Sequence, residues 1–167
     1  QEQAIATAEA ENIESFIGGI GNDLITVSQD ESVVNPGTDT NSIFESFVDK
    51  WGKNNLITGI SLTDASGVVT HNYSNISPVE IGTSLSDRDY YIWAKSQINS
   101  DNYIVGEPVI ARYGINKNKY ITPLSAPVFK DGVFSGILAT AIRIDEMANY
   151  FLSLMSASDT TDSYILG

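Results

Sequence analysis

The hydrophobic pattern of this chain changes its period at Leu56, and that change limits the folds that are available to it. Before Leu56, apolar residues recur at every third or fourth position, as they do on one face of an α-helix. After Leu56, short apolar and β-branched runs are separated by turn residues, as they are in strands. Helices followed by strands predict an α+β domain with an antiparallel sheet.

Two helices are predicted before the change of period. The first starts at the N-terminus, and its apolar stripe consists of Ile13, Phe16, Ile17, Ile20, Leu24 and Val27. Gly18, Gly19 and Gly21 interrupt it, each at a cost of about 1 kcal/mol relative to alanine, which indicates either a kink or a close contact with another helix. The second amphipathic helix is predicted from Ser42 to Lys53.

Five strand segments are predicted after the change of period, at 56–62, 68–73, 103–113, 120–129 and 133–144. Turns with glycine at the tight position, Gly67 and Gly132, join the first two and the last two segments as hairpins. A helix is expected between the second and third segments, and a short closing helix from Met147 to Met155. The predicted fold is one antiparallel sheet of about five strands with the N-terminal helix packed along it.

Composition excludes several classes of function. A net charge of −12 over 167 residues argues against nucleic acid or an anionic membrane as the partner. The chain has no cysteine and one histidine, His71, so we expect neither a metal site nor a cofactor. His71 is expected on a strand surface. No signal peptide and no run of 18 apolar residues is present, so any membrane anchors would lie outside this sequence.

The segment 81–95, IGTSLSDRDYYIWAK, is the strongest candidate for a binding site. Ser86 followed by Asp89 resembles a capping box and predicts a helix from Ser86 to about Ile98. Arg88 is one of three arginines in this acidic chain, and a guanidinium beside the free N–H groups of a helix start would form an anion site. The alternative is a surface arginine paired with Asp87 or Asp89, beside aromatic residues that fill a core.

In their order and spacing these segments resemble a Cache domain, the PAS-like extracytoplasmic sensor module of histidine kinases, chemoreceptors and cyclic-di-GMP enzymes. The resemblance is carried by the long first helix and by the motifs TDASG, IGTSLSDRDYY, GEPV and APVFKDGVFSGIL. It implies a helix that rises from a plasma membrane and a curved sheet. It also implies a ligand pocket between that sheet and the segment that carries Arg88.

The resemblance covers residues 1–155, most specifically 56–144, and divides the chain into three parts. Residues 1–55 are the helical region of the sensor module, residues 56–155 are its PAS-like core, and residues 156–167 are a terminal segment. The last residues, DSYILG, resemble the strand that begins a second module in tandem domains. Both a single and a double module are compatible with this pattern.

The resemblance also implies a class of ligand. Some Cache domains that bind amino acids carry Arg-x-Trp-Tyr on this helix, and the run from Arg88 to Tyr91 matches it with Tyr90 in place of tryptophan. At the positions that hold the amine in those relatives, this chain has Val109, Ala111 and Ala141. Alanine cannot pair with a buried ammonium group, so we expect a small carboxylate such as acetate, propionate, pyruvate or lactate.

Two tyrosines are further candidates. Tyr113 and Tyr120 flank the polar turn 116–119, where they either close over the pocket or pair across strands. The predicted site therefore consists of Arg88, Tyr90, Tyr91, Val109, Ala111, Tyr113 and Ala141.

Three functions are compatible with these features. The first is the ligand-binding input module of a membrane receptor. The second is a Cache-like module without a small ligand, which forms a homodimer through the stripe from Ile13 to Val27 or binds a partner protein. The third, an acidic secreted hydrolase, has the least support because no nucleophile stands beside a base at a readable spacing.

Overall fold

A six-stranded antiparallel sheet forms the centre of the structure, a computed structural model that describes residues 2–76, 81–112 and 116–154. The strand order is β2-β1-β6-β5-β3, and β4 pairs with β5 beside β3. The strands are β1 (Gly59–Thr63), β2 (Val69–Ser74), β3 (Ile104–Val105), β4 (Val109–Ile110), β5 (Tyr120–Lys130) and β6 (Val133–Arg143). The predicted α+β fold with one antiparallel sheet is confirmed.

The segment 103–113, predicted as one strand, contains two short strands instead. β3 pairs with β5 at Ser125 and Leu124, and β4 pairs with it again at Ile121 and Tyr120. Between them, Gly106 donates its N–H to the carbonyl of Pro123 at 2.8 Å, so close that a Cβ on Gly106 would lie 2.9 Å from the proline ring. Pro108 and Pro123 have no N–H to give to a ladder, and the pairing is interrupted there.

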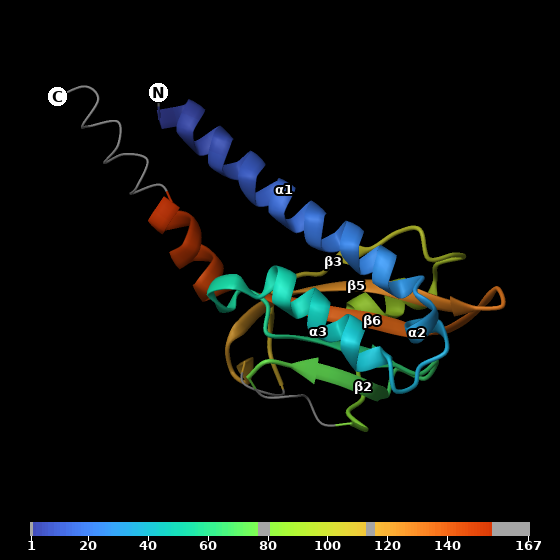
Figure 1. Cartoon of the computed structure of the whole chain (residues 1–167). Coiled ribbons are helices and arrows are strands. Elements are labelled where there is room, and N and C mark those ends of the chain that lie inside the picture. The colour runs from blue at the N-terminus through green and yellow to red at the C-terminus, as the bar shows by residue number, and fades with distance from the viewer. Residues whose placement is uncertain (1, 77–80, 113–115, 155–167) are drawn as a thin grey trace.

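Helices cover the two faces of the sheet unequally. The first face carries α1 (Glu2–Ser28), α2 (Glu31–Val34) and α3 (Thr40–Trp51), which is followed by the short 3-10 turn η1 (Lys53–Asn55). Figure 1 shows these helices lying across the sheet, with α1 extending well past its edge. The second face carries α4 (Asp89–Lys95).

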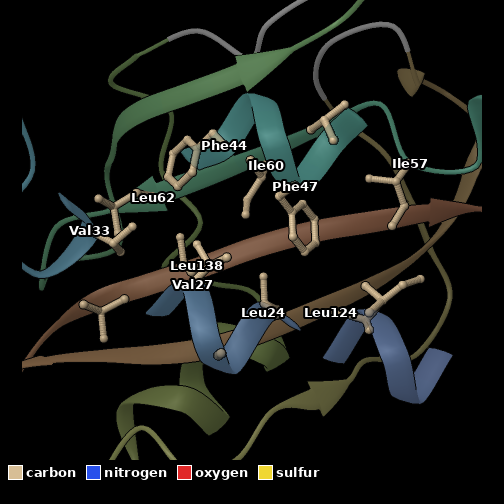
Figure 2. Packing of buried hydrophobic residues seen from close by; sticks show 14 of the residues in the cluster. Leu24, Val27, Val33, Phe44, Phe47, Ile57, Ile60, Leu62, Leu124 and Leu138 are labelled. Carbon is tan, nitrogen blue, oxygen red and sulfur yellow. The ribbon is translucent and has the colours of Figure 1, made fainter. Parts of the chain in front are cut away.

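The main core lies between the sheet and the first three helices. Figure 2 shows Leu24 and Val27 of α1 and Phe44 and Phe47 of α3 pointing into it. Leu24 and Phe44 are fully buried, and each such side chain contributes about 1.5–3 kcal/mol through its removal from water. The stripe of α1 from Ile20 onward therefore packs on the sheet.

Two of the three glycines in α1 lie where another element approaches the helix closely. A Cβ on Gly19 would lie 2.7 Å from the indole of Trp51, and one on Gly21 would overlap the ring of Tyr103. The same region is fixed by Asp23, which accepts a hydrogen bond from Trp51 Nε1 at 2.9 Å and forms an ion pair with Lys50 at 2.7 Å. The close helix contact, one of the two alternatives for these glycines, is confirmed at Gly19, which meets Trp51 of α3; Gly21 instead meets Tyr103, which precedes β3.

The helix predicted from Ser86 to Ile98 starts later and ends earlier. Arg88 is the N-cap residue of α4 and has an extended backbone, with φ −82° and ψ 140°. The chain before it is held against the β1–β2 hairpin, because Leu85 donates its N–H to Gly67 and Val69 donates its N–H to Thr83, both at 2.8 Å. Ser86 lies next to this paired stretch and does not cap a helix.

The closing helix begins directly after β6 and occupies residues 144–154, three residues earlier than predicted. Phe151 of this helix packs edge to face on Phe16 of α1, with the ring centroids 6.0 Å apart. Figure 1 shows the two helices leaving the sheet in the same direction. In the described residues, no helix is both long and apolar enough to cross a bilayer. The predicted terminal segment 156–167 lies outside the described residues.

Candidate ligand-binding site

A cavity of about 130 Å³ lies on the α4 side of the sheet. Residues of β1, β2, β4, β5 and β6 form most of its walls. Leu85, Arg88 and Tyr90, around the start of α4, line it as well. This is the position at which the resemblance placed a pocket.

Five of the predicted site residues line this cavity: Arg88, Tyr90, Val109, Ala111 and Ala141. Tyr91 lies elsewhere, because its hydroxyl donates to the carbonyl of Ala65 at 2.6 Å and its ring packs on Phe134. Tyr113 lies outside the described residues. The part that each of these residues plays in binding stays a prediction.

Aromatic packing beside Arg88 fixes the start of α4. Tyr90 and Tyr91 are buried with Ile137 and Ala139 of β6 in a second hydrophobic cluster, which holds the first turn of the helix against the sheet. The backbone N–H of Arg88 donates to the carbonyl of Leu85 at 3.1 Å. The Arg88 side chain is therefore presented to the cavity from a fixed backbone.

The Arg88 guanidinium keeps hydrogen-bonding capacity for a ligand. Its Nε is buried and has no hydrogen-bond partner among the described residues. Asp87, one of the acids predicted as a surface partner, is instead paired with Arg112, and no ion pair within 4 Å joins Arg88 to an acid in the described part of the chain. A buried N–H without a partner is costly, and an anion in the cavity would satisfy it.

Arg112 is a second arginine in the cavity wall, and the sequence reasoning did not select it. Its Nη1 donates to Asp87 Oδ2 at 2.7 Å, which links the end of β4 to the segment before α4. Strand alternation would have placed Arg112 on the face opposite Ala111. β4 ends at Ile110, however, and the alternation no longer applies beyond it.

Neutral polar side chains of β1 and β2 form the wall farthest along the sheet from β5. Ser61 pairs with Asn72 across the two strands, and Gly59 pairs with Ser74. Asn72 Nδ2 donates to Ser61 Oγ at 2.7 Å and to the carbonyl of Ile60 at 3.1 Å. In β2, whose sequence is VTHNYS, the alternate polar residues were the available sign of this wall in the sequence.

The charge inside the cavity is opposite to that of the chain. Two arginines line it, and none of the described lining residues is acidic, although the chain has a net charge of −12. This lining is suited to an anionic organic molecule.

Outside the cavity, His71 lies on β2 as expected, with Nδ1 3.0 Å from Thr70 Oγ1. In the described ranges, no three His, Asp or Glu side chains are grouped so that they would hold a metal ion.

We expect the pKa of Asp87 to lie below its usual 3.8, because the hydrogen bond from Arg112 and the positive charges of Arg112 and Arg88 stabilise the carboxylate more than desolvation destabilises it. A carboxyl group with a lowered pKa stabilises the fold above the pKa of the unfolded chain, and this contribution is lost as the pH falls through the folded-state pKa. Titration of the Asp87 carboxyl carbon by NMR should show the low pKa in the wild type and a higher pKa in Arg112→Ala. Lys117→Ala removes an exposed charge and should leave the pKa unchanged. An equal pKa in wild type and Arg112→Ala would contradict the pairing.

Comparison with solved structures identifies the fold. An extracellular ligand-binding receptor from Desulfohalobium retbaense matches 86% of this chain with a TM-score of 0.68 at 14% identity, and the match covers 25% of that receptor. The ligand-binding domain of the Campylobacter jejuni chemoreceptor Tlp3, in complex with 4-methylisoleucine, matches 87% with a TM-score of 0.63 at 14% identity, over 57% of its length. The ligand-binding domain of the Pseudomonas fluorescens chemoreceptor CtaA, in complex with L-serine, matches 86% of this chain with a TM-score of 0.63 at 18% identity. The match covers 58% of that domain.

The extracellular domain of a histidine kinase has the same fold. At these identities the likeness establishes the fold, so the Cache-type architecture that the sequence resembles is confirmed. The chain spans a quarter of the first of these structures and a little over half of the two chemoreceptor domains. No protein-family model and no curated protein sequence matches it.

Proposed function

We propose that this chain is the extracytoplasmic ligand-binding sensor domain of a transmembrane receptor, a chemoreceptor or a histidine kinase, and that it recognises a small carboxylate through Arg88. The observation that carries the proposal is that Arg88 lines the cavity and that its buried Nε has no partner among the described residues. The fold, shared with ligand-binding domains of chemoreceptors, supports a sensor in place of an enzyme.

The size of the cavity limits the ligand. An engineered cavity of about 150 Å³ in another protein holds benzene, so a cavity of this size accommodates roughly six non-hydrogen atoms. Its volume here is about 130 Å³. Propionate, pyruvate and lactate fall in this range. Val109, Ala111 and Ala141 give such a molecule an apolar surface to contact.

An α-amino acid is the second candidate, because Tlp3 and CtaA were solved with amino acids bound. The charges in the cavity favour the carboxylate. An ammonium group taken from water into a cavity requires an anionic partner, and none of the described lining residues is acidic. A module without any small ligand is the remaining alternative.

A thermal-shift screen followed by calorimetry tests the proposal. Acetate, propionate, pyruvate and lactate at 100 times their dissociation constants should add about 2.7 kcal/mol to the free energy of unfolding. In a domain of this size that raises the melting temperature by roughly 5–11 °C. Propionamide is the matched control, since it has the size of propionate without its charge and should not stabilise the domain.

Two other results would reject this assignment. Tight binding of an amino acid with all four carboxylates inert would favour the second candidate. An absence of binding by either class would favour a module that serves in dimerisation or in binding a partner protein.

A further inference from the structure

A second residue of the cavity wall, Asn116, also carries a buried polar atom without a partner among the described residues. The side-chain oxygen Oδ1 of Asn116 is buried and accepts no hydrogen bond from the described residues. Among the buried polar atoms of the described cavity lining, two therefore lack a partner: a donor, the Nε–H of Arg88, and an acceptor, the amide oxygen of Asn116. Buried polar groups in native proteins are normally paired, so both atoms indicate groups that a ligand supplies.

The backbone holds Asn116 in this position. Ala111 donates its N–H to the carbonyl of Lys119, and Asn118 donates its N–H to the carbonyl of Ala111, each at 2.9 Å. The N–H of Lys119 also donates to the carbonyl of Asn116 at 2.9 Å. These bonds tie the turn that contains Asn116 to the cavity-lining residue Ala111.

The chemistry of the two atoms specifies the ligand further than its charge does. A carboxylate has acceptors only, so it satisfies Arg88 and leaves Asn116 unpaired. An ammonium group would donate to Asn116, but a neutral amide cannot balance its charge in a cavity whose described lining has no acid. A hydroxyl group donates one hydrogen bond and carries no charge.

We infer that the ligand is a hydroxycarboxylate of roughly the size of lactate, with its carboxylate at Arg88 and its hydroxyl donating to Oδ1 of Asn116. This inference rests on the proposed function, because it specifies the second polar group of the same small carboxylate. It assigns to Asn116 the role of a specificity-determining residue.

Calorimetric titration with four probes tests the inference. L-lactate and D-lactate carry the hydroxyl, propionate lacks it, and pyruvate replaces it with a carbonyl that can only accept. One lactate enantiomer should bind wild type at least about tenfold tighter than propionate and pyruvate, because the two analogues leave Asn116 unpaired. In Asn116→Leu the lactate affinity should fall to that of propionate, while the propionate affinity stays within about threefold of its wild-type value.

Matched controls separate a loss of the lactate preference from a loss of folding. Lys117→Ala, at an exposed neighbour in the same turn, should preserve the lactate preference. If Asn116→Leu has a much lower melting temperature than wild type, Asn116→Ala provides the same comparison with a smaller side chain. The affinity of lactate relative to propionate and pyruvate is measured on wild type and does not depend on any variant.

The outcomes distinguish this inference from the proposed function. Equal binding of lactate and propionate by wild type, tighter binding of pyruvate, or an unchanged lactate preference in the Asn116 variants would overturn the inference and leave a carboxylate sensor in place. Failure of all four probes, and of acetate, to bind wild type would overturn the proposed function and the inference with it.

Discussion

Arg88→Ala should weaken binding of the carboxylate ligand by about 2–5 kcal/mol, or roughly 30- to 5,000-fold in the dissociation constant. Arg88 lines the cavity with a buried Nε that has no partner among the described residues, so a bound anion becomes its main countercharge. Removing the guanidinium leaves the anion desolvated and unpaired, and this penalty sets the size of the expected loss.

Two further variants of this region refine the expectation. Arg88→Lys should restore only part of the affinity, because an ammonium group cannot reproduce the planar fork that binds a carboxylate through two hydrogen bonds. Lys95→Ala, at the exposed last residue of α4, removes a charge from the same helix and should leave the affinity unchanged.

Folding should be less affected by Arg88→Ala than binding is. The residue caps α4 with its backbone only, since its side chain makes no capping hydrogen bond, and it is partly exposed. Calorimetry with the best carboxylate from the screen, together with thermal melts without ligand, measures the two effects separately. Equal dissociation constants for wild type and Arg88→Ala would remove Arg88 from the site and, with it, most of the case for a carboxylate sensor.

The fold was predictable from the sequence where hydrophobic periodicity and turn residues alone define an element. The change of period at Leu56 separated helices from strands, and the long hairpin of β5 and β6 is a run of apolar and β-branched residues around one tight turn. In the segment 103–113, Pro108 was a readable sign of a break, because proline cannot donate to a strand ladder, but the form of the break was not predictable in this way. It depends on Gly106 meeting Pro123 across the sheet, and that contact joins residues far apart in the sequence.

The site was predictable only in part, for similar reasons. The grouping of Arg88 with Val109 and Ala141 followed from the family resemblance and not from periodicity. Tyr91 was grouped with Tyr90, although consecutive residues of a helix point about 100° apart and need not face the same cavity. Asn116 was missed because its position depends on hydrogen bonds between the turn and Ala111.

Gly136→Ala should lower the free energy of unfolding by about 2–5 kcal/mol, a large effect for a single added methyl group. Gly136 lies in β6 opposite Val128 of β5, next to the register shift between Val128 and Phe129, and has φ +153°. A Cβ there would collide with the carbonyl oxygen of Thr63 and lie 3.1 Å from that of Asp64.

Both atoms that the methyl group meets belong to the backbone, so neither can turn aside as a side chain would. Thr63 is itself fixed, because its Oγ1 accepts the N–H of Ile137 at 3.1 Å and donates to the carbonyl of Asp64 at 2.9 Å. The collision must therefore be relieved by separating β1 from β6, the central pair of the sheet. Backbone strain of about 1–3 kcal/mol and overpacking of similar size add to the expected loss.

Gly132→Ala is the matched control, because Gly132 also has a positive φ, +77°, but a Cβ there would meet nothing within 4 Å. It should cost only the conformational strain, about 1–2 kcal/mol. Urea denaturation of the two variants compares strain alone with strain plus collision. A loss for Gly136→Ala no larger than that for Gly132→Ala would show that β1 and β6 separate readily. Ser61 and Ala139 face each other across the same two strands and line the cavity. In that case this wall of the cavity would deform more easily than the strand pairing indicates.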